Sequence, residues 1–170
     1  MSGFAGRYFE DFEAGKRIDH GIARTVTEQD NQSFTLLTYN TNMTHTNHEF
    51  ASHTEFGRPL MNSTFTLALV SGLTVRDISE NAVANLGWGE IEILNPVFAG
   101  DTIFASTWVL ETRESKSRPG AGIIKVRTLA YKGDREPVMR FVRSVMIHKR
   151  GQGPRAHWPM PPALKGADAL

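Results

Sequence analysis

The sequence contains no cysteine among its 170 residues. Disulfide bonds and thiolate metal sites are therefore excluded, and the composition is compatible with a reducing compartment. Charge of one sign is also lacking, because 19 Lys and Arg stand against 18 Asp and Glu and leave a net charge of +1. Such a balance provides no general attraction for nucleic acid or for an anionic membrane surface. We expect neither as a partner.

Long apolar runs are missing as well. The longest mostly apolar stretch, 65–75, is too short to cross a bilayer, and the first seven residues lack the basic flank and apolar core of a signal peptide. We therefore expect a cytoplasmic protein. The length is typical of one domain. We place it at residues 17–150, between an N-terminal arm at 1–16 and an irregular tail at 151–170.

A first helix is predicted over residues 28–37. Thr27 is suited to cap its start, and Asp30, three residues later, is suited to complete a capping box. We expect the apolar residues Phe34 and Leu37 to face the core.

Two further helices are predicted before the middle of the chain. A short one over 48–56 follows Asn47, a good N-cap residue, and would direct Phe50 inward. A longer one over 62–78 is apolar on nearly all sides, which indicates a helix enclosed by other structure.

Strand-like segments flank these helices. One precedes them at 18–26, and four longer ones follow at 82–94, 102–113, 122–132 and 136–148. Turn-forming residues separate the last four, which predicts an antiparallel meander. A curled antiparallel sheet around one long helix is the hot dog fold, of the α+β class. Because such a sheet leaves an edge strand unpaired, we expect a homodimer.

A polar stretch, Tyr39 to Asn47, lies between the predicted helices. Its Asn and Thr side chains compete with the backbone for hydrogen bonds, which predicts a structured loop. His45 is suited to take up and release a proton near neutral pH. From the residues alone, His45 is either a catalytic base or a hydrogen-bonded loop residue, and Asn40 and Asn42 are either substrate ligands or turn formers.

The histidines that follow this stretch do not have the spacing of a metal site. His48 and His53 are five residues apart, so on a helix they point about 140° away from each other. Zinc-binding histidines on one helix stand four apart. We expect no bound metal.

The order of these residues resembles the MaoC-like dehydratases, which include the (R)-specific enoyl-CoA hydratases. That family carries Asp-x-Asn-Pro-x-His, then Phe-Gly-x-Pro, then a His-Gly pair that opens the central helix, and later Pro-Val-Phe-x-Gly-Asp. The corresponding segments here are Asn40-Thr41-Asn42-Met43-Thr44-His45, Phe56-Gly57-Arg58-Pro59, Asn62-Ser63 and Pro96-Val97-Phe98-Ala99-Gly100-Asp101. The resemblance covers about residues 7–150 and is greatest for the branch of mesaconyl-CoA and itaconyl-CoA hydratases.

The resemblance implies a hydro-lyase acting on a short, branched or dicarboxylic enoyl-CoA, with coenzyme A as part of the substrate and no separate cofactor. His45 falls on the family's catalytic histidine and Asn40 on its catalytic aspartate. Ser71 matches a serine at the active site. The amides of Asn62 and Ser63, at the start of the central helix, are expected to hold the thioester oxygen.

The change from Asp to Asn at position 40 leaves alternatives open. Asn40 cannot take up a proton, so we expect His45 to carry proton transfer alone, with Asn40 positioning water or substrate. The same change favours a non-catalytic acyl-CoA binding protein. A thioesterase is a third possibility, disfavoured because no carboxylate stands between Asn62 and Arg76.

Three basic residues are candidates for binding anionic parts of a substrate. Lys116 and Arg118, on a predicted hairpin, are either ligands of the coenzyme A phosphates or a solvated hairpin tip. Arg58 is a candidate partner for a second carboxylate on the acyl group.

Overall fold

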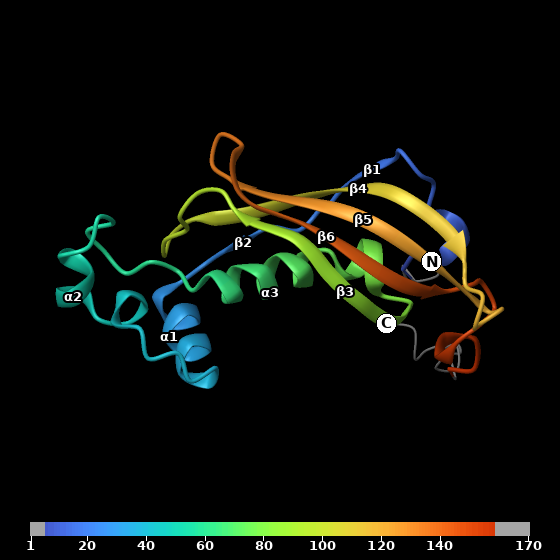
Figure 1. Cartoon of the computed structure of the whole chain (residues 1–170), viewed down its shortest axis with the longest axis horizontal. Coiled ribbons are helices and arrows are strands. Elements are labelled where there is room, and N and C mark those ends of the chain that lie inside the picture. The colour runs from blue at the N-terminus through green and yellow to red at the C-terminus, as the bar shows by residue number, and fades with distance from the viewer. Residues whose placement is uncertain (1–5, 159–170) are drawn as a thin grey trace, which may run out of the picture.

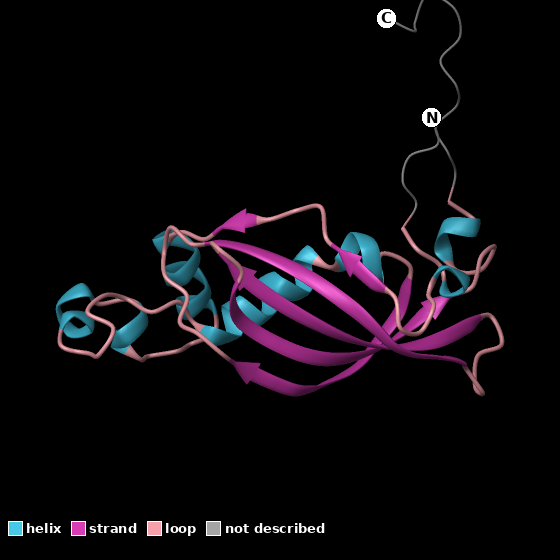
Figure 2. Cartoon of the chain, turned by 90° about the horizontal axis from the view of Figure 1, so that it is seen from above, coloured by secondary structure: helices cyan, strands magenta, loops and turns pink. Residues whose placement is uncertain are grey.

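The computed structural model describes residues 6–158 of the chain. A curved antiparallel sheet lies along one side of a central helix, and two smaller helices extend from one end of it (Figures 1 and 2). The helices are α1 (Glu28–Leu37), α2 (His48–Ser52) and α3 (Ser63–Leu73). The strands are β1 (Arg17–Asp19), β2 (Arg24–Thr25), β3 (Ala82–Ile93), β4 (Thr102–Glu114), β5 (Ala121–Lys132) and β6 (Glu136–His148). This is the predicted α+β hot dog fold.

The four long strands have the predicted bounds to within one residue, but their order differs from a simple meander. The sheet order is β1-β4-β5-β6-β3, with β2 beside β4. β3 therefore pairs with β6 and lies at the sheet edge. The connection 94–101 passes the start of α3, where the Met61 N–H donates to the Val97 carbonyl (2.9 Å). That contact draws the chain away from a hairpin between β3 and β4, so the predicted four-stranded meander is wrong at β3.

The predicted first strand is divided into β1 and β2. Between them the chain turns His20 inward, where its imidazole is fully buried. His20 Nδ1 lies 2.9 Å from Asp77 Oδ2, and His20 Nε2 lies 2.8 Å from Thr107 Oγ1. Thr107 is in turn bonded to Thr128 (2.9 Å). The His20 N–H still donates to the Ala105 carbonyl of β4 (3.2 Å), and its side chain adds a buried chain of polar contacts.

The central helix α3 is buried on the side that faces the sheet. Its buried residues are Phe65, Thr66, Val70 and Leu73. The opposite side, which includes Ala68 and Gly72, is exposed in a single chain. The helix also ends earlier than predicted, because the Thr74 hydroxyl donates to the Ser71 carbonyl (2.7 Å). A π-helical segment, η3 (Val75–Ser79), continues the chain.

Helix α1 begins as predicted, and Phe34 packs against the core as expected, but Leu37 does not. Thr27 and Asp30 form the capping box, with the Thr27 N–H donating to Asp30 Oδ2 (2.9 Å). The residues buried against the domain are Asn31 and Thr35, whereas Leu37 is 83% exposed. The predicted burial of Leu37 is therefore wrong. Polar partners on the neighbouring chain segments, described below, decide which face of α1 is buried.

Helix α2 is shorter than predicted. Asn47 caps it as expected, since its Oδ1 accepts from the Phe50 N–H (2.9 Å). The Ser52 and Thr54 hydroxyls donate to carbonyls of the last turn and close the helix. Phe50 is 41% exposed, so its predicted inward orientation is not observed.

Within residues 6–158, no helix has the length and the apolar composition needed to span a bilayer.

Candidate active site

The polar stretch before α2 forms two successive side-chain turns. Asn40 Oδ1 accepts from the Asn42 N–H (3.0 Å), and Asn42 Oδ1 accepts from the Thr44 N–H (3.0 Å). The second turn begins a single 3-10 turn, η2 (Met43–His45). Both asparagines therefore act as turn formers, and together they place His45 at the end of η2.

The ring of His45 is held by a main-chain carbonyl. Its Nδ1 lies 2.8 Å from the oxygen of Leu60. A carbonyl oxygen only accepts hydrogen bonds, so Nδ1 carries the proton in this contact and Nε2 of the neutral ring keeps a free lone pair. The residue is half-buried. His45 therefore has the orientation of a base that is directed by its other nitrogen.

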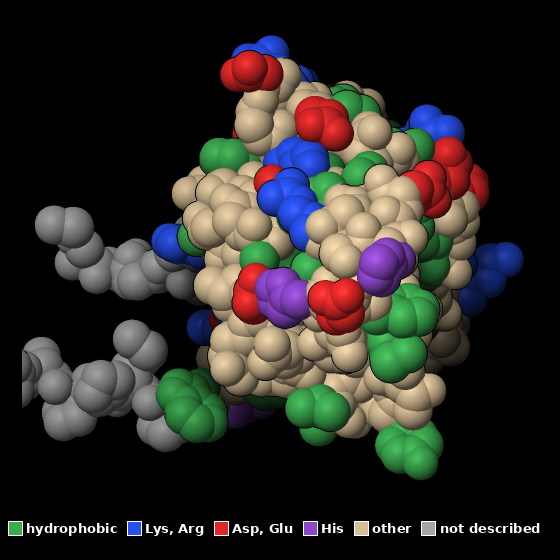
Figure 3. All heavy atoms as spheres, turned by 90° about the vertical axis from the view of Figure 1, so that its left-hand side faces the viewer, with side chains coloured by type: hydrophobic (Ala, Val, Ile, Leu, Met, Phe, Trp, Pro, Cys, Tyr) green, Lys and Arg blue, Asp and Glu red, His purple; other side chains and the backbone are tan. Residues whose placement is uncertain are grey.

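His45 lines a polar hollow of about 100 Å³ between α1, α2 and the segment before α3. Arg58 and His48 also line it, and His48 Nε2 lies 3.4 Å from Glu28 Oε2. Figure 3 shows acidic, basic and histidine side chains meeting on this end of the molecule. The surroundings of the hollow favour a polar or charged ligand.

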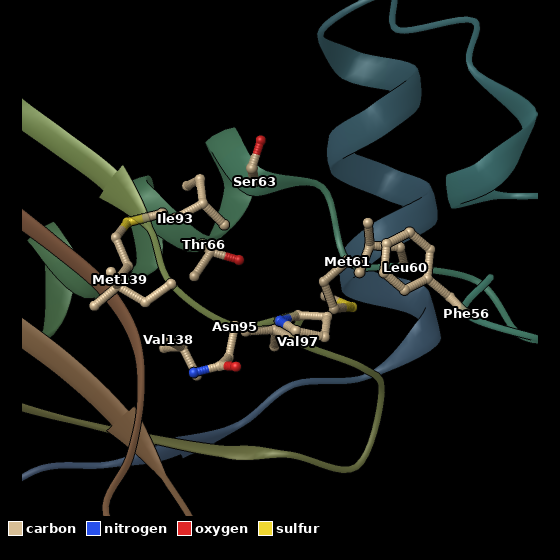
Figure 4. Close-up of a pocket in the computed structure, with 12 residues that line it drawn as sticks. Phe56, Leu60, Met61, Ser63, Thr66, Ile93, Asn95, Val97, Val138 and Met139 are labelled. Carbon is tan, nitrogen blue, oxygen red and sulfur yellow. The ribbon is translucent and has the colours of Figure 1, made fainter. Parts of the chain in front are cut away.

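An apolar cavity of about 210 Å³ lies on the other side of Met61, which lines both spaces. In Figure 4, Phe56, Leu60 and Met61 are on one side of this cavity and Ile93 and Met139 on the other. Polar groups reach it from Ser63, Thr66 and Asn95. An acyl group and a nearby polar group would find complementary surfaces here.

At the start of α3, the N–H of Ser63 is a main-chain donor without a partner in the described part of the chain. Asn62, which is 2% exposed, donates its N–H to Asn31 Oδ1 (2.9 Å) and accepts with its own Oδ1 from the Thr64 N–H (3.0 Å). Its amide is therefore occupied, and the expectation that it holds a thioester oxygen does not fit this geometry. The N–H of Ser63, by contrast, makes no hydrogen bond within residues 6–158. It points from a helix N-terminus, where negative charge is favoured.

Ser71 lies about 12 Å farther along α3 than Ser63. Its hydroxyl oxygen is buried and has no hydrogen-bond partner in the described part of the chain. The predicted role of Ser71 in substrate binding stays a prediction.

Lys116 and Arg118 are not brought to this site. They lie between β4 and β5, at the end of the sheet opposite to α1 and α2 (Figure 1). The length of β4, 13 residues, separates the two ends by roughly 40 Å. Within one chain, this separation does not fit a coenzyme A whose thioester is near His45, and the predicted role of the two residues in phosphate binding stays a prediction.

The histidines near the hollow do not form a metal centre. His53 lies beside Glu49 (3.4 Å), on the exposed side of α2, and His48 beside Glu28. Among the described residues, no group of three His, Cys, Asp or Glu side chains is arranged to hold an ion.

Asn31 is a site residue that the sequence reasoning missed. Its side-chain amide contacts the His45 loop, the segment before α3 and the start of α3. Asn31 and Thr35 stand four residues apart, a spacing that places both on one face of a helix. This pair of polar residues at helical spacing is the sequence signal that could have identified Asn31.

The chain was compared with known proteins. A family model described as "MaoC like domain" matches residues 11–131. The chain is 37% identical to a mesaconyl-CoA hydratase from Cereibacter sphaeroides, over 97% of this chain and 48% of that protein. It is 33% identical to a β-methylmalyl-CoA dehydratase from Chloroflexus aurantiacus, over 85% of this chain and 41% of that protein. The chain therefore spans about half the length of the curated relatives that it matches.

The structural comparison gives a similar result. A solved MaoC domain protein from Chloroflexus aurantiacus superposes with a TM-score of 0.84 and 30% sequence identity. The superposition covers 98% of this chain and 46% of that protein.

Proposed function

The chain belongs to the MaoC-like domain family, and from that premise we propose that it is a hydro-lyase acting on a short enoyl-CoA thioester. The observation that carries the proposal is the orientation of His45 by the Leu60 carbonyl, in a polar hollow that shares Met61 with the apolar cavity lined by Ser63. The names of two relatives, a hydratase and a dehydratase, support either direction of the reaction.

In the hydration direction, His45 Nε2 accepts a proton from water as the water oxygen bonds to the β carbon of the enoyl group. The electron pair of the double bond moves toward the thioester and forms an enolate. The Ser63 N–H, at the positive end of α3, stabilises the negative charge on the enolate oxygen. Return of the proton from His45 to the α carbon completes the addition, and dehydration is the reverse sequence.

Asn40 supports this reaction through the loop that carries His45. Its Oδ1 is used in the turn to the Asn42 N–H, and its amide cannot take up a proton. Its remaining Nδ2–H groups are suited to hold the attacking water or a substrate oxygen. Asn42, which begins η2, has the same positioning role.

The acyl group is proposed to enter the apolar cavity beside Ser63. A cavity of about 210 Å³ is suited to a short acyl chain. Arg58 lines the adjoining hollow with His45, and its guanidinium Cζ lies 3.9 Å from the Phe98 ring centroid. No carboxylate within residues 6–158 forms an ion pair with Arg58. We propose that it pairs with a second carboxylate of the substrate, since a mesaconyl group carries one.

The proposed assembly is a homodimer formed along β3. This edge strand exposes Leu86, Trp88, Ile91 and Ile93, and each of these side chains is about half exposed. A long apolar edge favours pairing with another strand. The matched relatives are about twice as long as this chain, which is consistent with a second unit of similar size. A measured mass near twice 18.9 kDa would support the dimer, and a monomer with full activity would contradict it.

A thioesterase is less well supported. Asp77 is the carboxylate nearest to α3 in the sequence. It lies 2.9 Å from the buried His20 and is therefore already engaged in a hydrogen bond. A binding protein without activity remains the alternative to be tested directly.

The test follows the loss of enoyl thioester absorbance with mesaconyl-CoA and crotonyl-CoA. Hydration of at least one of the two by the wild-type chain is the expected result, and Asn40→Asp should retain it, because a carboxylate also accepts from the Asn42 N–H. Absence of hydration with both substrates, together with measurable binding of either, would establish a non-catalytic acyl-CoA protein instead. Arg58→Ala should reduce turnover of mesaconyl-CoA much more than that of crotonyl-CoA. An equal loss with both would assign Arg58 to the coenzyme A moiety.

A further inference from the structure

We propose that Asn31 is a positioning residue for His45. It determines which ring nitrogen of His45 carries the proton, and it holds the imidazole in place relative to the start of α3. The inference rests on the proposed hydro-lyase function for its kinetic consequence, and on geometry alone for its structural one. Asn31 lines the same hollow as His45, but its three side-chain hydrogen bonds are all made to main-chain groups, and we therefore assign it a role that acts through His45.

The side chain of Asn31 bonds to three separate segments. Nδ2 donates to the main-chain oxygen of His45 (2.8 Å) and to that of Leu60 (3.0 Å), and Oδ1 accepts from the Asn62 N–H (2.9 Å). Asn31 is 2% exposed, and α1 carries it from a position well before the site in sequence. One amide therefore joins the catalytic loop, the segment that precedes α3 and the first turn of α3.

The Leu60 carbonyl is the point at which Asn31 and His45 meet. This oxygen accepts both from Asn31 Nδ2 (3.0 Å) and from His45 Nδ1 (2.8 Å). A carbonyl oxygen has two lone pairs, so the two donors together occupy it fully. With Asn31 in place, the peptide that bears this oxygen cannot rotate away from the imidazole. Asn31 thereby keeps Nε2 as the free nitrogen of His45.

The bond to Asn62 extends this control to the oxyanion donor. Holding the Asn62 N–H fixes the residue before Ser63, whose own N–H is the free donor at the start of α3. The positions of the proposed base, His45, and of the proposed oxyanion donor, the Ser63 N–H, thus both depend on the side chain of Asn31. A displacement of about 1 Å between reacting groups lowers rates by up to about 100-fold, so such a link has a measurable effect.

An ordinary structural role for Asn31 makes a different prediction. A buried asparagine that merely satisfies three backbone groups would affect stability and nothing else when replaced. A positioning residue also changes the balance between the two neutral forms of the His45 ring. That balance is read directly from the imidazole nitrogens by long-range ¹H–¹⁵N NMR, without substrate, and the His45 signals are assigned by their absence in His45→Ala.

Two variants separate the parts of the contact. Asn31→Asp keeps the acceptor for the Asn62 N–H and replaces the donor to His45 and Leu60 by an oxygen. Asn31→Ala removes all three bonds and introduces no charge. Thr128→Val is the matched control, because it also deletes a buried hydroxyl bond (2.9 Å to Thr107) but lies in the sheet, away from His45.

In the wild type, the form of His45 protonated at Nδ1 should dominate. In folded Asn31→Asp and Asn31→Ala, the form protonated at Nε2 should gain population, and kcat should fall about 10- to 100-fold with KM within about threefold of wild type. Thr128→Val should change neither the balance between the two ring forms of His45 nor kcat. A folded Asn31→Ala protein with the wild-type ring balance and the wild-type kcat would overturn the proposal. If the wild type shows no hydration at all, the proposed function fails, and the NMR comparison still decides the role of Asn31.

Discussion

The Nδ1 atom of His45 lies 2.8 Å from the main-chain oxygen of Leu60, and this contact decides which nitrogen of the ring is free to act as a base. The same oxygen also accepts from Asn31 Nδ2 (3.0 Å), which holds it in place. The arrangement differs from a carboxylate-directed histidine, because a carbonyl orients the ring without adding a negative charge beside it.

Replacement of His45 by glutamine should lower kcat for enoyl-CoA hydration by about 10²- to 10⁴-fold, because general acid–base catalysis contributes about this much. Glutamine keeps a side chain of similar length that is able to donate to Leu60, so the fold should be retained. The control is His53→Gln, at an exposed residue whose ring lies 3.4 Å from Glu49 and contacts no part of the site. Steady-state kinetics on both variants makes the comparison. Equal activity of His45→Gln and His53→Gln would contradict the assignment.

The buried chain from Asp77 through His20 to Thr107 should contribute to stability and not to turnover. His20→Ala removes the hydrogen-bond partner of the Asp77 carboxylate and one of the two partners of the buried Thr107 hydroxyl. The expected loss is about 2–4 kcal/mol in the free energy of unfolding, measured by denaturant titration. The kcat of the folded protein should stay near wild type. A similar loss in His157→Ala, an exposed histidine, would show that the buried contacts are not the cause.

Arg143 is a buried cation whose removal should stabilise an isolated chain. Its Nη2 donates to Thr74 Oγ1 (3.1 Å), its Nε has no partner, and no carboxylate within residues 6–158 pairs with it. Burial lowers the pKa of the Arg143 guanidinium to about 10. Arg143→Met, a substitution of similar length, should therefore raise the free energy of unfolding by about 1–3 kcal/mol at pH 7.

The pH dependence of the Arg143 effect has a definite sign. Between about pH 10 and the higher pKa of the unfolded chain, the unfolded state holds the proton that the folded state has released. Wild-type stability therefore gains from rising pH in this window relative to Arg143→Met. Below about pH 10 the full penalty of the buried charge is present. Denaturant titrations of both proteins at pH 7 and pH 10.5 test this. A less stable Arg143→Met protein would contradict the prediction.

The capping box of α1 should make a contribution that disappears in acid. Burial opposes ionisation of Asp30, but hydrogen bonds from the N–H and the hydroxyl of Thr27 and the charge of Arg24 outweigh it and hold the pKa of the carboxyl below 3.8. The stabilisation is therefore complete above about pH 4 and is lost as the pH falls through the lower pKa of the folded state. Asp30→Asn should cost about 1 kcal/mol at pH 7 and less at pH 3, as measured by unfolding. Equal costs at the two pH values would argue against the charged cap.

Local features of this fold were predictable from the sequence. The strand bounds, the Thr27 and Asp30 cap and the turns at Asn40 and Asn42 each depend on residues within a few positions of one another. The tendencies of these residues are the same in any context, so pattern and side-chain chemistry were enough.

The predictions that were wrong concern features that depend on residues distant in the sequence. Asn31 and Thr35 face inward because Asn62 offers hydrogen bonds to both, the first through its N–H (2.9 Å) and the second through its Nδ2 (3.3 Å). A hydrophobic pattern read along α1 alone places Phe34 inward correctly, but it also turns Leu37 inward and misses the two buried polar residues. The placement of β3 beside β6 likewise depends on a contact of Met61 with a segment more than thirty residues away.

Leu60 performs two tasks with two chemically independent parts. Its carbonyl orients His45, and its side chain lines the apolar cavity proposed for the acyl group. Substitution at position 60 exchanges the side chain and leaves the carbonyl in place. The size of the proposed acyl pocket can therefore change during evolution while His45 keeps its orientation. A change of substrate range at this position does not require a simultaneous repair of the catalytic machinery.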